Sequence, residues 1–212
     1  MEMGHPAPRR HISVAGNIGV GKSTLVEILA QEFGWQPYYE HVSDHPYLAD
    51  YYADRARWGF HSQIWFLTQR YTQHHQITLM HQSVIEDRSM YEDFEIFVKE
   101  LHAENVLSPR DFMLYQQLYA TLVQRIQPPT LVIYLQAQVS TLQQRIAQRG
   151  RASEQQIPVE YLTRLNERYE GWMRDFSHCA VLPIVTDDLD VVNRPSDRMA
   201  VVDAIRRQLA LI

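Results

Sequence analysis

Five short apolar runs mark the hydrophobic pattern of this chain, and longer stretches with helical spacing separate them. The clearest run is Thr130–Leu135 (TLVIYL), which follows two prolines. The other runs are His11–Ala15, Pro37–Val42, Val84–Asp87 and Val181–Val185. Short continuous apolar runs are typical of strands that are buried on both faces of a parallel sheet. The pattern therefore predicts five such strands.

Apolar residues recur at helical spacing between these runs, as Leu25, Ile28 and Leu29 do before Gly34, which stands where a helix usually ends. Strands that alternate with helices predict a three-layer α/β sandwich, in which helices cover both faces of a parallel five-stranded sheet. No linker or repeat interrupts the chain, so we expect a single domain over residues 1–212, with residues 1–10 as a loose N-terminal tail. The predicted helices are Ser23–Phe33, Trp58–Met80, Glu92–Leu101, Asp111–Ile126, Leu142–Gln148, Pro158–Phe176 and Arg198–Leu211.

The overall charge narrows the classes of partner. The formal net charge is −5 and the sequence pI is about 6.0. Proteins that bind nucleic acid usually present a basic face, so we expect no nucleic-acid partner. No apolar run approaches the ~18 residues of a membrane span, so we expect no membrane association. The expected partner is a small molecule.

Cysteine and histidine give little sign of a metal centre. Cys179 is the only cysteine, which excludes an intramolecular disulfide and a zinc site built from several cysteines. A single thiol fits a reducing compartment, so the expected location is the cytoplasm. The ten histidines contain no HExxH pattern, and we expect the pairs His41/His45 and His74/His75 to lie at the surface.

Residues 16–23 (GNIGVGKS) match the phosphate-binding pattern GxxxxGK[ST], between a predicted strand and a predicted helix. Its glycines let backbone N–H groups face phosphate oxygens, and the helix N-terminus adds partial positive charge. Lys22 is expected to reach the β- and γ-phosphates, and the Ser23 hydroxyl to ligate Mg²⁺. The sequence therefore predicts a P-loop NTPase that uses ATP and Mg²⁺. The predicted phosphate-binding residues are Gly16, Asn17, Ile18, Gly19, Val20, Gly21, Lys22, Ser23 and Thr24.

The loop alone does not distinguish a kinase from a GTPase or an ATPase. The chain lacks the NKxD motif by which a GTPase usually reads guanine, and an ATPase motor would usually be longer. Glu40 follows the second predicted strand, and Asp87 and Arg88 close the third. Carboxyl ends of parallel strands gather around the ligand crevice, so we expect these side chains beside the phosphates. Glu40 could accept a proton from an attacking hydroxyl, and Asp87 could bind Mg²⁺ with Ser23.

A basic cluster surrounds Gly150. It contains Arg145, Arg149 and Arg151, with Glu154 close behind. In phosphoryl transfer such arginines neutralise charge on the transferred group, and a mobile lid can exclude water. We expect an arginine-rich lid over residues 145–157.

Taken together, these segments resemble the deoxyribonucleoside kinase family. The resemblance rests on GNIGVGKST, on the strand-end Glu40, on EDRSMYED (Glu86–Asp93) and on the lid RGRASEQQIPVEYL (Arg149–Leu162). Supporting stretches are HPYL (residues 45–48), RWGFHSQIWFL (residues 57–67) and YEGWM (residues 169–173). The resemblance covers residues 11 to 190 and is greatest to the bacterial deoxyadenosine/deoxycytidine kinase branch.

The resemblance implies catalytic roles at matching positions. Glu40 resembles the general base, and Arg88 resembles the arginine beside the 5′-oxygen of the acceptor. Asp87 stands where animal members usually carry glutamate, and its shorter reach allows a water between it and Mg²⁺. Arg145, Arg149 and Arg151 match the lid arginines that contact ATP.

Further positions match the residues that hold the nucleosides. Tyr52 and Glu154 match the pair at the 3′-hydroxyl, and Ser153 departs from a second lid acid that is typical of the family. Asp188 belongs to the loop Asp187–Asp190, which is similar to the loop that packs on the ATP adenine. The set that reads and stacks on the acceptor base is Gln63, Arg70, Asp93 and Phe97. The Gln63 amide can accept from an exocyclic amine and donate to a ring nitrogen, or the reverse when flipped, so Gln63 alone does not choose the base.

The family reading implies transfer of the ATP γ-phosphate to the 5′-hydroxyl of a deoxyribonucleoside in nucleotide salvage, with deoxyadenosine favoured and deoxyguanosine or deoxycytidine as further acceptors. Two alternatives stay open. One is a nucleoside monophosphate kinase like thymidylate kinase, and the other is a non-catalytic ATP-binding subunit. The family also implies a homodimer that pairs through apolar faces of long helices, and Trp65, Phe66 and Leu67 are apolar neighbours on one such helix.

Overall fold

The computed structural model describes residues 8–40, 44–151, 154 and 157–212. Five strands in this part of the chain form one sheet in the order β2-β3-β1-β4-β5. Every neighbouring pair is parallel, and Ile12 of β1 lies between Ile85 of β3 and Leu131 of β4. The strands are β1 (His11–Gly16), β2 (Gln36–Tyr38), β3 (Val84–Asp87), β4 (Leu131–Gln136) and β5 (Ala180–Val185). The predicted parallel five-stranded sheet is confirmed.

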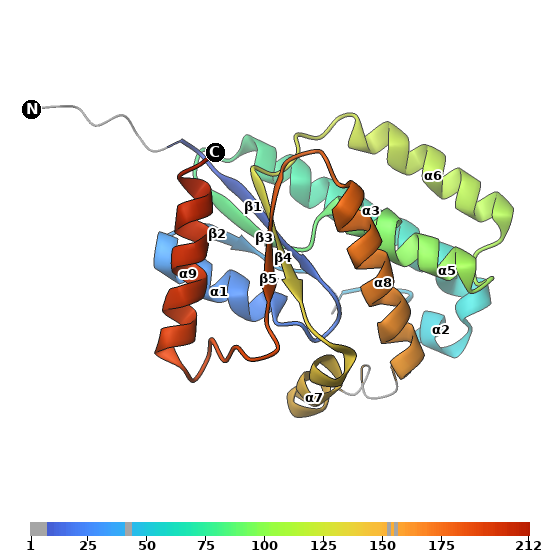
Figure 1. Ribbon diagram of the computed structural model, residues 1–212. Helices are drawn as coiled ribbons and strands as arrows, with labels where there is room; N and C mark the ends of the chain where they lie inside the picture. The colour runs from blue at the N-terminus through green and yellow to red at the C-terminus, as the bar shows by residue number, and fades with distance from the viewer. Residues whose placement is uncertain (1–7, 41–43, 152–153, 155–156) are drawn as a thin grey trace, which may run out of the picture.

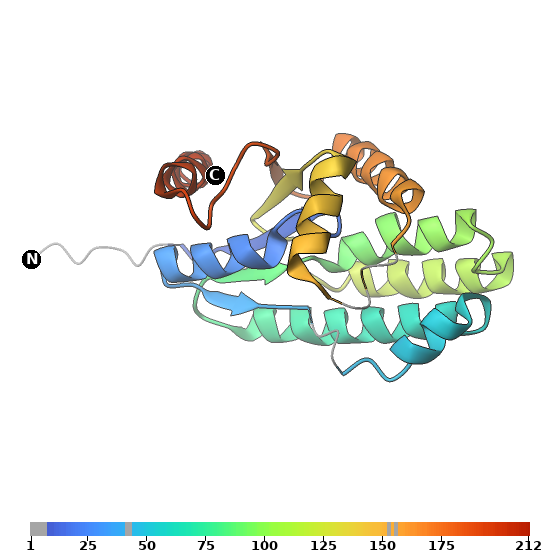
Figure 2. The same cartoon turned by 90° about the horizontal axis from the view of Figure 1, so that it is seen from below.

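Helices cover both faces of the sheet (Figure 1). Helices α1, α7 and α9 pack on the face that carries Ile12, Val14 and Ile133. Helices α3, α6 and α8 pack on the face that carries Ala15 and Val132. Figure 2 shows α1 and α3 on opposite sides of the sheet. The helices are α1 (Lys22–Phe33), α2 (Leu48–Ala53), α3 (Arg55–Leu79), α4 (Met90–Glu92), α5 (Lys99–Ala103), α6 (Pro109–Val123), α7 (Val139–Arg149), α8 (Val159–Asp175) and α9 (Pro195–Leu209).

A π-helical segment, η1 (Asp93–Val98), joins α4 to α5 without a break. The sequence predicted ordinary helix from Glu92 to Leu101. π-Helical turns are rare in proteins as a whole, but those that occur often lie at functional sites. Asp93 and Phe97, two predicted base-contacting residues, lie within this segment.

Several other boundaries differ from the prediction. The short helix α2 was missed, because the six residues of Leu48–Ala53 make fewer than two turns and so show no helical period. Strand β2 ends at Tyr38, short of the predicted Val42, and residues 41–43 lie outside the described part of the chain. Helix α1 ends as predicted at Gly34, whose φ of 67° is left-handed and suits glycine.

The N-terminal residues that the structure describes are held in place. The predicted tail covered residues 1–10, of which 1–7 lie outside the described residues. Arg10 donates from its backbone N–H to Ser83, and its guanidinium donates to the carbonyls of Leu209 and Ile212. Arg9 donates to the carbonyl of Ile77. The expectation of a loose tail is therefore wrong for Arg9 and Arg10, which tie β1 to α3 and α9.

Histidine placement also differs from the prediction. His45 and His74 are buried, whereas we expected them at the surface; His75 is exposed as expected. The rings of Trp65 and Phe66 pack against His45, with centroids 4.3 Å and 4.7 Å away. None of the helices in the described residues is long and apolar enough to cross a membrane.

Candidate active site

The phosphate loop joins the end of β1 to the start of α1, at the carboxyl edge of the sheet. Gly16 and Gly19 have φ values of 143° and 82°, which other residues rarely adopt. A Cβ on Gly16 would lie 2.6 Å from the carbonyl oxygen of Leu135, and a Cβ on Gly19 would lie 2.7 Å from Ile146. The glycines therefore serve both the backbone turn and the close approach of β4 and α7.

Lys22 is buried and folds back over the loop. Its Nζ donates to the carbonyls of Gly16 and Asn17, each at 2.9 Å. Burial, and then the nearby Arg88, lowers the pKa of Lys22 to about 8. This side chain is a buried cation held by two neutral carbonyls, and phosphate oxygens would be stronger partners.

Ser23 and Asp87 meet beside Lys22. The Ser23 hydroxyl donates to Oδ2 of Asp87 at 2.5 Å, and Oδ1 of Asp87 is buried with no hydrogen-bond partner. A hydroxyl and a carboxylate with a spare oxygen are ligands of the kind that Mg²⁺ takes. The donor set therefore fits the predicted Mg²⁺ ion.

Arg88 occupies a strained position at the end of β3. Its φ is 73°, unusual for a residue with a side chain, and strain of this kind clusters at functional sites. Its N–H donates to the carbonyl of Val14 at 3.0 Å, and its guanidinium lies 4.5 Å from the ring centroid of Phe97. The buried Nε has no hydrogen-bond partner. The guanidinium is thus held over Phe97 with donor capacity to spare.

Glu40 lies between two arginines. Its Oε1 accepts from Arg70 at 2.6 Å, and its Oε2 lies 3.9 Å from Nε of Arg88. Burial alone would raise the pKa of Glu40, but Arg88, Arg70 and Lys22 together lower it. The side chain keeps 27% of its surface exposed. Glu40 is therefore an ionised carboxylate at the rim of the site, available to an incoming hydroxyl.

Arg70 of α3 connects the acids of the site. Besides Glu40, it donates to the carbonyls of Asp87 and Arg88, each at 3.0 Å, and lies 3.5 Å from Oδ1 of Asp93. Burial raises the pKa of Asp93 to about 7, and Arg70 opposes that rise. Oδ2 of Asp93 is buried and has no hydrogen-bond partner. Arg70 thus supports the strained strand end as well as the predicted base-reading acid.

The remaining nucleoside residues lie on two elements. Gln63 is buried on α3, seven residues before Arg70 and so on the same helical face. Tyr52 is exposed on α2, and burial, Tyr51 and Glu154 raise its pKa. Glu154 thus acts on the ionisation of Tyr52, and the shared role of the two residues at a 3′-hydroxyl stays a prediction.

The lid arginines have different surroundings. Arg149 and Arg151 both pair with Glu154. Arg145 instead donates to the carbonyls of Val20, Thr186 and Leu189, and so links the phosphate loop to the loop after β5. Asp188 is exposed in that second loop, and its carbonyl accepts from Arg194. Ser153 lies outside the described residues.

Two buried residues of the site were given no role from the sequence, although both lie in stretches that carried the resemblance. Glu92 is fully buried and accepts from the N–H of Ser89 at 2.9 Å, completing a helix capping box. The hydroxyl of Tyr169 donates to the same carboxylate at 2.7 Å. The Ser89-x-x-Glu92 spacing was a signal for the cap. No local pattern links Glu92 to Tyr169, which lies 77 residues away.

A second polar cluster lies at the opposite end of β1. His11, His74 and Glu86 are buried with potential ligand atoms within 4.8 Å of one another. Each already has a protein partner: His11 contacts Glu86 at 3.0 Å, and His74 contacts the carbonyl of Gln127 at 2.8 Å. This cluster fixes β1, β3 and α3 together, away from the phosphate loop.

Comparisons with known proteins found matches over most of the chain. The family model "Deoxynucleoside kinase" matches residues 12–210. A deoxyadenosine/deoxycytidine kinase of Bacillus subtilis (strain 168) is 37% identical over 205 residues, which cover 95% of this chain and 94% of the relative. A deoxyguanosine kinase of the same organism is 32% identical and covers 88% and 91% of the two chains. The solved deoxyadenosine kinase from M. mycoides with dCMP and dCDP bound superposes with a TM-score of 0.82 at 29% identity, covering 95% of this chain and all of that one (100%).

Proposed function

The chain belongs to the deoxynucleoside kinase family and is a deoxynucleoside kinase, and from this premise we propose that it transfers the γ-phosphate of ATP to the 5′-hydroxyl of deoxyadenosine in preference to other acceptors. Membership of this family excludes the two alternatives, a nucleoside monophosphate kinase and a non-catalytic subunit. The observation that carries the proposed chemistry is the ionised Glu40 between Arg70 and Arg88, within electrostatic reach of Lys22.

Glu40 is the proposed base. Its carboxylate would accept a hydrogen bond from the 5′-hydroxyl and take the proton as the oxygen attacks the γ-phosphorus in line. The lowered pKa of Glu40 keeps it ionised, and also makes it a weak base, so we place proton transfer late in the reaction. The spare Nε of Arg88 would donate toward the 5′-oxygen or the transferred group. Positioning and charge stabilisation then supply most of the rate enhancement.

The phosphates are assigned to the loop over residues 16–24. Lys22 would exchange the carbonyls of Gly16 and Asn17 for β- and γ-phosphate oxygens. Ser23 and Asp87 would hold Mg²⁺, which would neutralise phosphate charge when bound. Arg149 and Arg151 would leave Glu154 for the phosphates, while Glu154 and Tyr52 would hold the 3′-hydroxyl.

The proposed preference for deoxyadenosine rests on the relatives and on the base-reading residues. The similar Bacillus subtilis enzyme is a deoxyadenosine/deoxycytidine kinase, and M. mycoides deoxyadenosine kinase has been solved with dATP and with dCTP. Adenine and cytosine both present an exocyclic amine beside a ring nitrogen acceptor. The buried amide of Gln63 can pair with both groups. Phe97, beneath the Arg88 guanidinium, would stack on the base.

The direct test is an ADP-release assay with Mg-ATP, four deoxynucleosides, adenosine and the deoxynucleoside monophosphates. We expect the highest kcat/KM with deoxyadenosine and little turnover of monophosphates. Glu40→Gln should lower kcat by about 10²–10⁴. Glu32→Gln, an exposed glutamate on α1, is the matched control. A Glu40→Gln enzyme with wild-type kcat would remove the base assignment, and faster turnover of deoxyguanosine would remove the acceptor preference.

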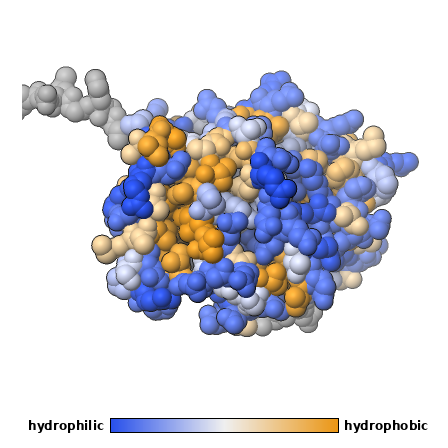
Figure 3. Space-filling model, in the orientation of Figure 1, coloured by the Kyte–Doolittle hydropathy of each residue, from blue (hydrophilic) through white to orange (hydrophobic). Residues whose placement is uncertain are grey.

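We also propose a homodimer. The run Trp65–Leu67 does not provide its surface, because Leu67 is buried and the other two rings pack on His45. Figure 3 shows apolar residues over β5 and α9, where Val185 and Met199 are exposed. We instead assign the surface for a second copy to a groove of about 620 Å³ between α5 and α8, which Trp172, Arg164 and Arg168 line together with acidic residues.

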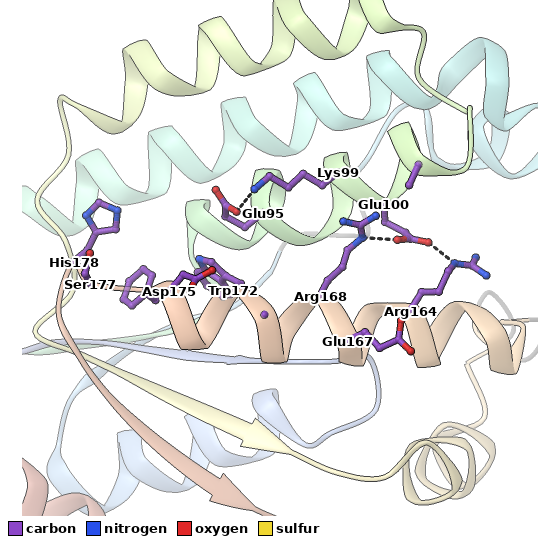
Figure 4. Close-up of a pocket in the computed structure, with 13 residues that line it drawn as sticks. Glu95, Lys99, Glu100, Arg164, Glu167, Arg168, Trp172, Asp175, Ser177 and His178 are labelled. Atoms are coloured by element: carbon purple, nitrogen blue, oxygen red, sulfur yellow. Dashed lines mark hydrogen bonds and ion pairs between the residues drawn. The ribbon is translucent and has the colours of Figure 1, made fainter.

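Figure 4 shows this groove, where the ion pairs of Glu100 with Arg164 and Arg168 cross between the two helices. A Cβ on Gly171 would meet no atom within 4 Å, so a side chain there would enter the groove without disturbing the core. Light scattering should find a dimer for the wild type and for Gly171→Ala, and a monomer for Gly171→Arg. A monomeric wild type, or a dimeric Gly171→Arg, would refute this interface.

A further inference from the structure

Glu92 makes more contacts than a helix cap needs. One carboxylate oxygen, Oε2, accepts from the N–H of Ser89 at 2.9 Å and completes the capping box. The other, Oε1, accepts from the Tyr169 hydroxyl at 2.7 Å and, at 3.4 Å, from the N–H of Gly16. A single side chain therefore joins the start of α4, the first residue of the phosphate loop and α8.

A carboxylate in this position is costly unless it is well paired. Glu92 is 0% exposed, and burial raises its pKa, while Arg88 and Lys22 oppose the rise. Those two cations are the ones assigned to the acceptor oxygen and the phosphates. In an ordinary cap, Oε1 would be in water. Here Oε1 instead contacts the first residue of the phosphate loop and the Tyr169 hydroxyl.

Three hydrogen bonds hold the strained turn at Arg88, and Glu92 accepts one of them. The N–H of Arg88 is held by Val14, its carbonyl by Arg70, and the next N–H, that of Ser89, by Glu92. A positive φ at a residue with a side chain persists only when its surroundings hold it. Glu92 supplies one of these three restraints.

Tyr169 connects this turn to the lid. It is 0% exposed on α8, the helix that directly follows the lid, and its ring stacks on Tyr134 of β4 with centroids 5.9 Å apart. The phosphate loop meets α8 at a second point, where the Asn17 amide donates to the carbonyl of Leu162 and to Asn166. Helix α8 is therefore fixed both to Glu92 and to Asn17 of the phosphate loop.

We propose that Glu92 and Tyr169 are positioning residues for phosphoryl transfer, which hold Arg88 and the start of the phosphate loop in register with the lid helix. Neither side chain needs to touch ATP or the deoxynucleoside. Their effect is on the geometry that the reacting groups adopt in the transition state, so it falls on kcat rather than on KM. The inference rests on the proposed function, because turnover is its main readout.

The test compares Tyr169→Phe, Glu92→Gln and the double variant with wild type, using Mg-ATP and whichever deoxynucleoside the wild type turns over fastest. Tyr169→Phe removes one hydroxyl and keeps the stacked ring. We expect kcat to fall about tenfold, the size of one hydrogen bond to a charged group, with both KM values within about twofold. The double variant should lose no more than Glu92→Gln alone, because both changes break the same link. Tyr161→Phe, on the same helix but packed on Arg55 and Arg164, is the control and should keep wild-type kcat.

A wild-type kcat in Tyr169→Phe, or losses that multiply in the double variant, would overturn the proposal. So would a change seen only in Tm or in the folded fraction, which marks a purely structural contact. Hydrogen exchange gives a readout that is independent of turnover. The amides of Gly16 and Ser89 should exchange faster in Glu92→Gln than in the wild type. Unchanged exchange at both amides would overturn the positioning role of Glu92, whichever acceptor the enzyme uses.

Discussion

Lys22 should make ATP binding depend on pH in a range where few other groups titrate. Its pKa is about 8 in the free protein, because burial and Arg88 disfavour the charged form. Phosphate oxygens favour that form, so binding should return the pKa at least to its ordinary value near 10.4. Because the pKa is raised by binding, the favourable contribution is fully present below about pH 8 and is lost progressively as pH rises from about 8 through the bound-state value near 10.4.

The size of the effect follows from these two values. Between pH 7.5 and 9.5 the protonated fraction of free Lys22 falls from about three quarters to about 3%. ATP affinity should therefore fall about 20-fold over this range, or roughly 1.8 kcal/mol. The full shift of the Lys22 pKa from about 8 to about 10.4 would set an upper limit of about 3.3 kcal/mol. Binding at pH 8.5 should also take up about 0.75 of a proton.

Isothermal titration calorimetry measures both quantities, when ATP is titrated in two buffers with different ionisation enthalpies. The ATP phosphates ionise near pH 6, below this range. Burial raises the pKa of Cys179 to about 11, above the range. Lys22→Arg is the control, since arginine stays protonated throughout and should give weaker but pH-independent binding. An affinity that changes less than twofold between pH 7.5 and 9.5 in the wild type, with no proton uptake, would refute the reasoning.

Three further outcomes are expected. Gly34→Ala should destabilise the fold by about 1–2 kcal/mol in urea unfolding, because the φ of Gly34 is 67°. Gly171→Ala, in the interior of α8, should instead stabilise the fold by up to about 1 kcal/mol. Equal effects of the two changes would contradict the argument from backbone conformation. Burial lowers the pKa of His74, so its share of the stability is present above about pH 6.5 and is lost below it as the unfolded chain gains a proton. His74→Gln should therefore flatten the stability profile between pH 7 and pH 5 as measured by Tm, while the exposed His75→Gln should leave it unchanged, and identical profiles would count against the role of burial. The resemblance also implies that Tyr52 crowds a 2′-hydroxyl, so Tyr52→Phe should raise turnover of adenosine relative to deoxyadenosine several-fold. An unchanged ratio in the kinase assay would remove this role in sugar selection.

The sheet could be predicted from sequence because its strands are continuous apolar runs, and β3 was placed at its observed ends, Val84 and Asp87. The edges of the sheet are also encoded in the sequence, by proline. Pro37 and Pro183 lie in β2 and β5, the two outer strands, where a missing N–H is tolerated. The order of the central strands depends on which helices pack together, and no local pattern reports that.

Residues at strand ends were easier to find than residues behind them. Glu40, Asp87 and Arg88 follow from the rule that ligands bind at the carboxyl ends of parallel strands. Glu92 was hidden because its important partners are 76 and 77 residues away in sequence. The burial of His74 was hidden because its partner, the carbonyl of Gln127, is 53 residues away and belongs to the backbone.

The π-helical segment Asp93–Val98 has a consequence for how the chain tolerates length changes. Each residue turns an α-helix by about 100°, so the wider π-turn accommodates one residue more than a regular helix would and rotates α5 against α4. As a result, Glu92 of α4 faces the end of β3 and the phosphate loop, while Glu100 of α5 faces α8. Deleting one residue here would restore a regular helix and turn one of the two faces away from its partner. Insertions and deletions should therefore be tolerated far less in this short segment than in the exposed loops. A change of one residue would rotate either the Glu92 contacts or the groove between α5 and α8 out of place.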